Sequence, residues 1–331
     1  MTNSISKERY FELLFTNKEE EHHLATLLIE KHNILPKKLY RYRPINGFLQ
    51  DTLENDIAFL SSALNFNDPY DSGLTVSYSQ NIEEYVREMV LEDFCKSTLQ
   101  YFDNKNFDDY LNEIKMTLSD VSLDYLGFVL GGSFSQEPMI KARNIEVISN
   151  KIHSALNELK SIQNDFIGKL SVIFQSKIYA ACFTECHDNI LMWSHYAQNH
   201  EGICIEYDFN SLPIPSLIVD RLSPVKYTDK LFNKDDYLLK DPINIATLAS
   251  LSKYECWSYE KEWRIISPLI EEQYFQLNKP TAVIFGTKTP QDDKVWISEI
   301  CQKRGIPIKQ AELDRTEYKL HIKETPIVSP V

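Results

Sequence analysis

One short run late in the chain constrains the fold more than any other feature. Residues 259–266 read Tyr-Glu-Lys-Glu-Trp-Arg-Ile-Ile, so Glu260, Glu262 and Arg264 alternate with Lys261, Trp263 and Ile265. Successive side chains of a β-strand point to opposite faces, and this pattern therefore predicts a strand with Trp263 in the core. Glu260, Glu262 and Arg264 then share the other face. Two carboxylates one repeat apart repel each other unless a cation lies beside them.

These clustered charges leave two interpretations open. In the structural one, Arg264 and Lys253 neutralise Glu260 and Glu262 on a solvated face. In the functional one, the carboxylates are gathered for chemistry, where one stabilises developing positive charge and the other serves as a general base.

Composition narrows the class of protein. The chain has 331 residues, of which 43% are hydrophobic and 25% charged, as in soluble globular proteins of one large or two small domains. A net charge of −13 disfavours non-specific nucleic-acid binding. We expect no membrane partner and no signal peptide, because no apolar run is long enough. Six scattered cysteines favour the reducing cytoplasm.

The order of periodic segments predicts an α+β protein with a mixed, mainly antiparallel sheet core and a large helical insertion. We expect N-terminal helices in 1–35, the core in 36–79 and 176–331, and the insertion in 80–175. The expected strands are 38–43, 57–61, 74–78, 177–184, 203–207, 225–227, 260–266, 282–286, 308–313 and 319–322. The expected helices lie in 5–31, 47–55, 189–200, 241–255 and 290–304, and 63–72 is expected to be a loop.

Two arginines on the first expected strand suit an anion. Arg41 and Arg43 point to one face of that strand, and a planar guanidinium binds a pyrophosphate through two parallel hydrogen bonds. The alternative is a structural pairing with Glu260 or Glu262, which requires the two strands to be near neighbours. Hydroxyls at the end of the next strand, Ser61 and Ser62, are suited to orienting a ribose.

The expected helix over 189–200 carries a second group of candidates. Trp193, Tyr196 and His200 form one stripe on it, which suits either the core or a cofactor site. We expect Trp193 and Tyr196 to be largely buried. His195 lies off the stripe and is a candidate proton donor that we expect to reach a cleft. Cysteines and histidines nearby lack zinc-site spacing, so we predict no metal.

The Asn-Asp-Pro turn at 67–69 is rigid, and its side chains are suited to bonding their own backbone. With this turn added, the chain resembles the domain-of-unknown-function 2971 family of bacterial proteins over about residues 37–270. The resemblance rests on Leu39–Arg43, Phe66–Asp71, Met192–Ala197 with His200 and Gly202, and Tyr259–Arg264. It implies no established chemistry, but it implies an association with bacterial defence and abortive infection.

A more distant resemblance is to ADP-ribosyltransferases of the arginine–serine–glutamate type. It implies that Arg41 or Arg43 holds the pyrophosphate of NAD and that Ser61 or Ser62 supports the nicotinamide ribose. Glu262 would contact the ribose 2′-hydroxyl and Glu260 would activate the acceptor, while Trp193 or a tyrosine such as Tyr196 would stack on nicotinamide. The departures are Ala63, which stands where a third hydroxyl is usual, and the long helical interruption.

The favoured hypothesis is an NAD-using ADP-ribosyltransferase-like toxin or effector of antiphage defence, with a protein or nucleic-acid acceptor. One alternative is a non-catalytic sensor that binds a defence partner through the insertion. The other is a metal-dependent nucleic-acid enzyme that uses Asp68, Asp71, Glu260 and Glu262.

Overall fold

The computed structural model describes residues 2–16, 23–75, 171–213, 216–233, 242–268 and 273–324, with scattered positions between 150 and 169. Residues 1–75 and 170–331 form one compact unit, and residues 76–169 form another. All the described strands belong to the first unit. The helical insertion expected over 80–175 falls mostly outside the described residues, so it stays a prediction.

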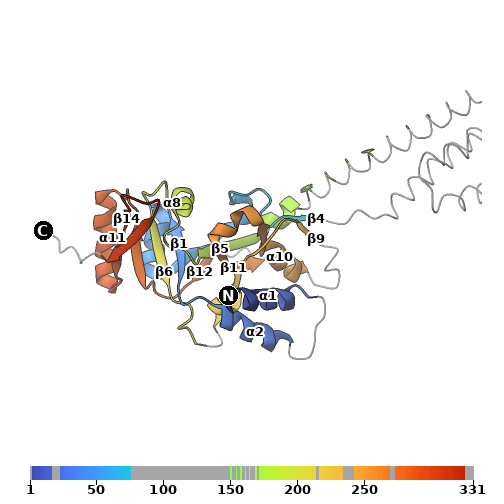
Figure 1. Cartoon of the computed structure of the whole chain (residues 1–331), viewed down its shortest axis with the longest axis horizontal. Helices are drawn as coiled ribbons and strands as arrows, with labels where there is room; N and C mark the ends of the chain where they lie inside the picture. Colours follow the sequence, from blue (N-terminus) through green and yellow to red (C-terminus); the bar gives the residue numbers. More distant parts are fainter. Residues whose placement is uncertain are drawn as a thin grey trace, which may run out of the picture. The chain divides into compact units, whose positions relative to one another are not determined.

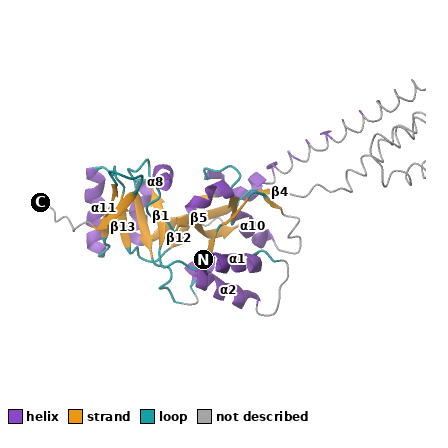
Figure 2. Cartoon of the chain, in the orientation of Figure 1, coloured by secondary structure: helices purple, strands orange, loops and turns teal. Residues whose placement is uncertain are grey.

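A mixed, mainly antiparallel sheet forms the centre of the first unit (Figures 1 and 2). Its order is β15-β14-β13-β6-β1-β5-β11-β7, and β3 pairs with β5 beside this path. Its strands are β1 (Leu39–Arg43), β3 (Ser61–Ser62), β5 (Ile178–Thr184), β6 (Ile203–Tyr207), β7 (Leu222–Pro224), β11 (Glu262–Pro268), β13 (Ala282–Phe285), β14 (Ile308–Leu313) and β15 (Leu320–Glu324). The α+β prediction is confirmed.

Three small strand pairs accompany this sheet. They are β2 (Ile57–Phe59) with β12 (Tyr274–Gln276), β8 (Lys226–Thr228) with β10 (Ser252–Tyr254), and β4 (Leu74–Thr75) with β9 (Phe232–Asn233). The pairs β8 with β10 and β4 with β9 are parallel. The two strands of a parallel pair cannot be joined by a tight turn, so a longer connection lies between them.

Helices cover both faces of the sheet. The helices are α1 (Thr2–Leu14), α2 (His23–Ile34), α3 (Gly47–Asn55), α8 (Ile190–Tyr196), α9 (Leu217–Arg221), α10 (Pro242–Ser250) and α11 (Gln291–Arg304). The main core takes buried side chains from α1, α2, α3, α9 and α11 on one face. Trp193 of α8 and Ala246 of α10 belong to smaller clusters on the other face.

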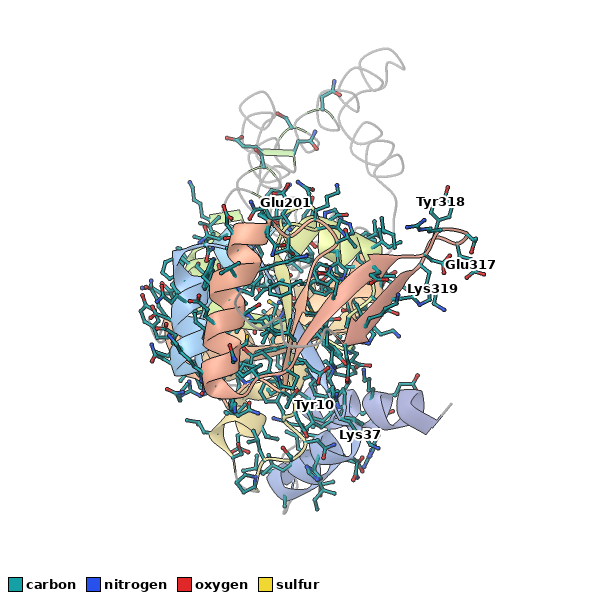
Figure 3. The ribbon with its side chains drawn as sticks, turned by 90° about the vertical axis from the view of Figure 1, so that its left-hand side faces the viewer. Tyr10, Lys37, Glu201, Glu317, Tyr318 and Lys319 are labelled. Atoms are coloured by element: carbon teal, nitrogen blue, oxygen red, sulfur yellow. The ribbon has the colours of Figure 1, made fainter. Side chains whose placement is uncertain are left out.

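Beyond α11, exposed Tyr318 marks the turn of the β14–β15 hairpin (Figure 3). Within the described residues, no helix has the length and apolar character needed to cross a bilayer.

The middle of the sheet is split. β1 pairs with β6 along all its residues, and β5 pairs with β11 in the same way. Between β1 and β5 the register contains one pair, Tyr40 with Thr184. Further along β5, the short strand β3 replaces β1 as the hydrogen-bonded neighbour, and Ser61 lies opposite Ala180. The strands therefore diverge beside residues 41–43 and leave room between them for side chains.

Two expected elements are wrong in ways that matter for function. The strand expected from Glu260 begins only at Glu262, because residues 255–260 form a 3-10 helix (η3, Glu255–Glu260) and Lys261 follows in a left-handed conformation with φ 43°. The helix expected to reach His200 ends at Tyr196. Gln198, Asn199 and His200 have φ values of 49°, 52° and 72°, so the chain turns sharply there.

Other differences arise where tertiary pairing overrides the local pattern. The single strand expected over 57–61 is divided at Leu60, because β2 pairs with β12 and β3 pairs with β5. The helix expected over 241–255 ends at Ser250, and the next residues pair with β8 as strand β10. Strand 225–227 is replaced by β7 and β8 on either side of Val225. The strand over 74–78 is described only as far as Thr75.

The turn that follows α8 packs closely against the backbone of neighbouring segments. A Cβ added to Gly202 would lie 2.3 Å from the carbonyl oxygen of Arg43, and one added to Gly286 would lie 2.1 Å from that of His200. The turn after α8 therefore fits directly against the ends of β1 and β13. This contact fixes the end of β1, which carries Arg43.

We expect Gly202→Ala to lower the free energy of unfolding by about 1–3 kcal/mol, because the methyl group has no space beside Arg43. Urea denaturation followed by circular dichroism measures the change. Gly47→Ala is the control, since a Cβ there meets nothing within 4 Å. Equal stability of the two variants would contradict the proposed close contact.

Candidate functional site

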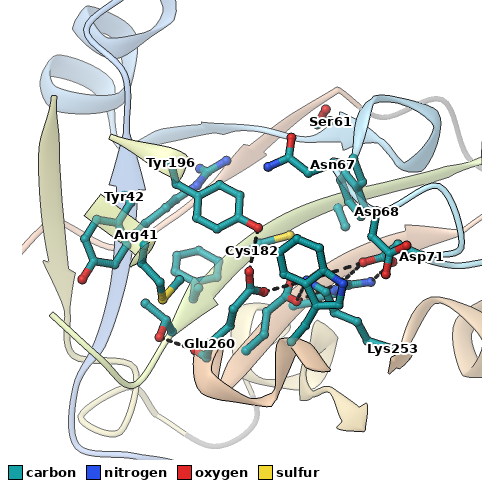
Figure 4. Close-up of a pocket in the computed structure, with 18 of the residues that line it drawn as sticks. Arg41, Tyr42, Ser61, Asn67, Asp68, Asp71, Cys182, Tyr196, Lys253 and Glu260 are labelled. Carbon is teal, nitrogen blue, oxygen red and sulfur yellow. Dashed lines mark hydrogen bonds and ion pairs between the residues drawn. The ribbon is translucent and has the colours of Figure 1, made fainter. Parts of the chain in front are cut away.

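A cavity of about 230 Å³ lies at the split between β1 and β5 (Figure 4). Its wall includes residues 40–43 of β1, Ser61 of β3, the loop 65–68 with Asp71, Tyr196 of α8 and the segment around η3. In Figure 4, Arg41 and Tyr196 lie to one side, while Asn67, Asp68 and Lys253 lie to the other. Because the strands diverge here, side chains from both faces of β1 reach one cavity.

A fully buried arginine organises one end of this cavity. The Arg264 guanidinium donates to both carboxylate oxygens of Asp71 at 2.7 and 2.6 Å, and to both of Glu262 at 2.8 and 2.9 Å. Its remaining N–H donates to the carbonyl oxygen of Ser250 at 2.7 Å, at the end of α10. Every donor of the guanidinium therefore has an acceptor, as a buried cation requires.

Lys253 links this arginine cluster to Glu260. Its ammonium donates to Glu260 at 2.6 Å and to Glu262 at 3.0 Å. The second oxygen of Glu260 accepts from the hydroxyl of Tyr196 at 2.6 Å. Glu260 and Glu262 thus converge although they lie on a 3-10 helix and a strand respectively, and both are buried rather than solvated.

The two glutamates differ in electrostatic environment. Burial works to raise the pKa of Glu262, but the charges of Arg264 and then Lys253 hold that pKa well below its usual range. At Glu260 burial has the larger effect and raises the pKa, although Lys253 opposes it. Glu262 is therefore a fixed anion within an ion network, whereas Glu260 is closer to a group that can exchange a proton.

Among the described residues, the arginines of β1 have no carboxylate partner. Arg41 is 5% exposed and donates one hydrogen bond, to the carbonyl oxygen of Phe59 at 2.7 Å. Its Nη1 and the Nε of Arg43 are buried without a hydrogen-bond partner. Burial lowers the pKa of Arg41, and burial followed by the charge of Arg41 lowers the pKa of Arg43 to about 9. Two adjacent guanidiniums without a counter-ion mark a site suited to an anion.

The alternative of a structural pairing between these arginines and the glutamates is not formed in the described part of the chain. Among the described residues, no ion pair joins Arg41 or Arg43 to Glu260 or Glu262. Their strands lie on either side of β5, and the carboxylates are occupied instead by Lys253 and Arg264. The sequence indicated Lys253 and Arg264 as candidate partners of the two glutamates. It did not indicate that Asp71 is a third carboxylate bound to these cations, because Asp71 is 193 residues from Arg264.

The other candidates separate into two groups. Ser61 lines the cavity, and its hydroxyl makes one long bond of 3.5 Å, to the carbonyl oxygen of Ser62. Ser62 lies outside the lining and caps the short 3-10 helix η1 (Ala63–Asn65). Trp193 is buried as expected, with its indole N–H on the carbonyl oxygen of His187, so it is not placed to stack on a ligand.

The side chains of His195 and Tyr196 lie on different sides of α8. His195 is exposed and is not among the residues that line the cavity. Tyr196 is partly buried and holds Glu260. Within the described parts of the chain, no cluster of three His, Cys, Asp or Glu residues has the arrangement of a metal site.

Comparison with known proteins adds one match. A family model described as "Protein of unknown function (DUF2971)" matches residues 192–265. No curated protein and no solved structure matches the chain. The matched segment is narrower than the resemblance expected over 37–270, yet it contains Tyr196, Lys253, Glu260 and Glu262. Arg41 and Asp71 lie before it, so the cavity combines matched and unmatched segments.

We expect Asp71→Ala to lower the free energy of unfolding by about 3–5 kcal/mol, because it removes one partner of a buried ion network. Chemical denaturation measures the loss. Glu312→Ala is the control: it breaks the exposed pair with Lys323, whose side chain is 63% exposed, and such pairs contribute about 0–1 kcal/mol. A similar small effect at both positions would show that Arg264 does not organise this end of the cavity.

Proposed function

We propose that the cavity binds NAD and that the protein breaks the bond between its ribose and nicotinamide, as an ADP-ribosyltransferase or an NAD glycohydrolase does. One observation carries the proposal. Buried guanidinium N–H groups of Arg41 and Arg43 without partners line the same cavity as Glu260, a buried carboxylate with a raised pKa.

The arginines supply the binding half of the proposal. A pyrophosphate offers several anionic oxygens, and a guanidinium binds such oxygens through charge-assisted hydrogen bonds. An anion in the cavity would also offset the cost of burying Arg41 Nη1 and Arg43 Nε without acceptors. We infer that Ser61, which lines the cavity and makes one long hydrogen bond of 3.5 Å, contacts the ribose of the same ligand.

Glu260 supplies the chemical half. When nicotinamide leaves, its ring nitrogen takes the bonding electron pair and positive charge develops on the ribose. A preorganised carboxylate stabilises that charge. Water or an acceptor nucleophile then forms the new bond to the ribose carbon, and Glu260 takes its proton. Glu262 is less suited to either step, because two cations, Arg264 and Lys253, hold it through three hydrogen bonds. Glu260 accepts from one cation, Lys253, and from the neutral hydroxyl of Tyr196.

A non-catalytic nucleotide sensor is the second candidate. It is favoured by the extent of ion pairing, since Lys253 contacts both Glu260 and Glu262 and lowers the reactivity of each carboxylate. A sensor would bind NAD without releasing nicotinamide. The metal-dependent alternative is not favoured, because Arg264 and Lys253 already neutralise Asp71, Glu260 and Glu262. We also propose a role in antiphage defence and a protein or nucleic-acid acceptor. Both rest on the family resemblances alone.

We expect Glu260→Gln to slow nicotinamide release from NAD by about 10²-fold or more, because the amide keeps the size of the side chain but removes its charge. Release is followed by chromatography, and the melting temperature is measured in parallel. Glu255→Gln is the control, since this exposed carboxylate lies on the same 3-10 helix. Wild-type protein that binds NAD without releasing nicotinamide, with acceptor supplied, would favour the sensor instead.

We expect Arg43→Met to weaken binding of ADP-ribose by about 10-fold or more, because hydrogen bonds to charged groups contribute about 1.5–3 kcal/mol. The free energy of unfolding should stay unchanged or rise, since a partly buried guanidinium whose Nε has no hydrogen-bond partner is removed. Titration calorimetry and denaturation measure the two effects.

Arg304→Met is the matched control, because Arg304 pairs with Asp56 at 2.8 and 2.7 Å outside the cavity. It should show the reverse pattern, with lower stability and unchanged affinity. Loss of stability without loss of affinity in Arg43→Met would identify Arg43 as structural.

A further inference from the structure

The Asn-Asp-Pro turn reaches the cavity with an unused acceptor. Asn67 and Asp68 both line the cavity, and Asp68 is 8% exposed. Its Oδ1 accepts from the backbone N–H of Tyr70 at 2.9 Å, which is the turn-stabilising bond expected of this residue. Its Oδ2 is buried without a hydrogen-bond partner. Stabilising the turn therefore accounts for the position of Oδ1 but gives no reason for burying Oδ2.

Asp68 differs in this respect from the other carboxylates of the cavity. Asp71, Glu260 and Glu262 are all engaged by Arg264 or Lys253. Among the described residues, Asp68 Oδ2 is the buried carboxylate oxygen that lacks a partner. Leaving such an oxygen without a donor is costly, so a hydrogen-bond donor from outside the chain is the natural complement.

We propose that Asp68 Oδ2 accepts a hydrogen bond from a hydroxyl or amino group of a ligand whose phosphates are held by Arg41 and Arg43. The cavity then takes a nucleotide-like ligand with an anionic part and a neutral donor group. The identity of the ligand as a nucleotide rests on the proposed function. Asp68 also sets the direction of binding, because its charge repels phosphate and the arginines attract it.

Titration calorimetry with pyrophosphate and with ADP-ribose separates the two parts of this site. Asp68→Asn keeps the oxygen that accepts from Tyr70, so the turn is preserved, and it replaces the free oxygen with a donor. Pyrophosphate affinity should be unchanged or higher, whereas ADP-ribose affinity should fall by about 10-fold or more. Asp208→Asn is the matched control, because Asp208 accepts from the backbone N–H of Ser211 in a turn outside the cavity.

Analogues of adenosine diphosphate then distinguish an amino donor from a hydroxyl donor. Inosine diphosphate lacks the amino group and the 2′-deoxy analogue lacks one hydroxyl. The analogue that wild type and Asp68→Asn bind equally well lacks the group that Asp68 contacts.

Three outcomes decide between this inference and the proposed function. ADP-ribose binding that is unchanged or tighter in Asp68→Asn, or an equal loss for pyrophosphate, would overturn the role of Asp68. Wild-type protein that binds ADP-ribose but does not cleave NAD would overturn the enzyme alone, and the Asp68→Asn comparison would still stand. Wild-type protein that binds neither pyrophosphate nor ADP-ribose would overturn both.

Discussion

The buried guanidinium of Arg264 is the contact on which the site depends. It joins Asp71 of the early loop, Ser250 at the end of α10 and Glu262 at the start of β11. A buried ion network contributes little net stability over apolar packing, but it tolerates few alternative arrangements because each charge needs its partner. Arg264 therefore fixes the position of the loop that carries Asp68, and so it determines the shape of the cavity as much as its charge.

The split in the sheet is the second constraint. A continuous β1–β5 ladder would place Arg41 and Arg43 on the face opposite Tyr40 and Tyr42, away from Glu262. The pairing stops after Tyr40 and Thr184, so the cavity forms between the strands. Close contact of Gly202 with the carbonyl of Arg43 holds the end of β1 in this position. Backbone packing at one end and ion pairing at the other thus define the same space.

Much of the framework could be predicted from sequence, because its signals are local. β1 and β6 follow from the alternation of their side chains, and α3 matches the short helix expected over 47–55. Glu260 was misplaced because its alternation with Glu262 suits a strand, while Lys261 between them is left-handed as the cap of η3. The carbonyl oxygen of Lys261 accepts from the distant backbone N–H of Glu185. The exposed position of His195 and the partnership of Asp71 with Arg264 also depend on contacts between distant segments, which no single stretch encodes.

Charge in the cavity is balanced in number but separated in space. Four acidic side chains and four basic ones line it, in a chain with net charge −13. Lys253 and Arg264 form ion pairs with Asp71, Glu260 and Glu262. These three carboxylates are therefore not available to neutralise the arginines of β1. Arg41, Arg43 and Asp68 each consequently keep a buried polar atom that has no hydrogen-bond partner among the described residues. Because buried polar groups are rarely left unpaired in proteins, this separation supports the proposed ligand of complementary charge.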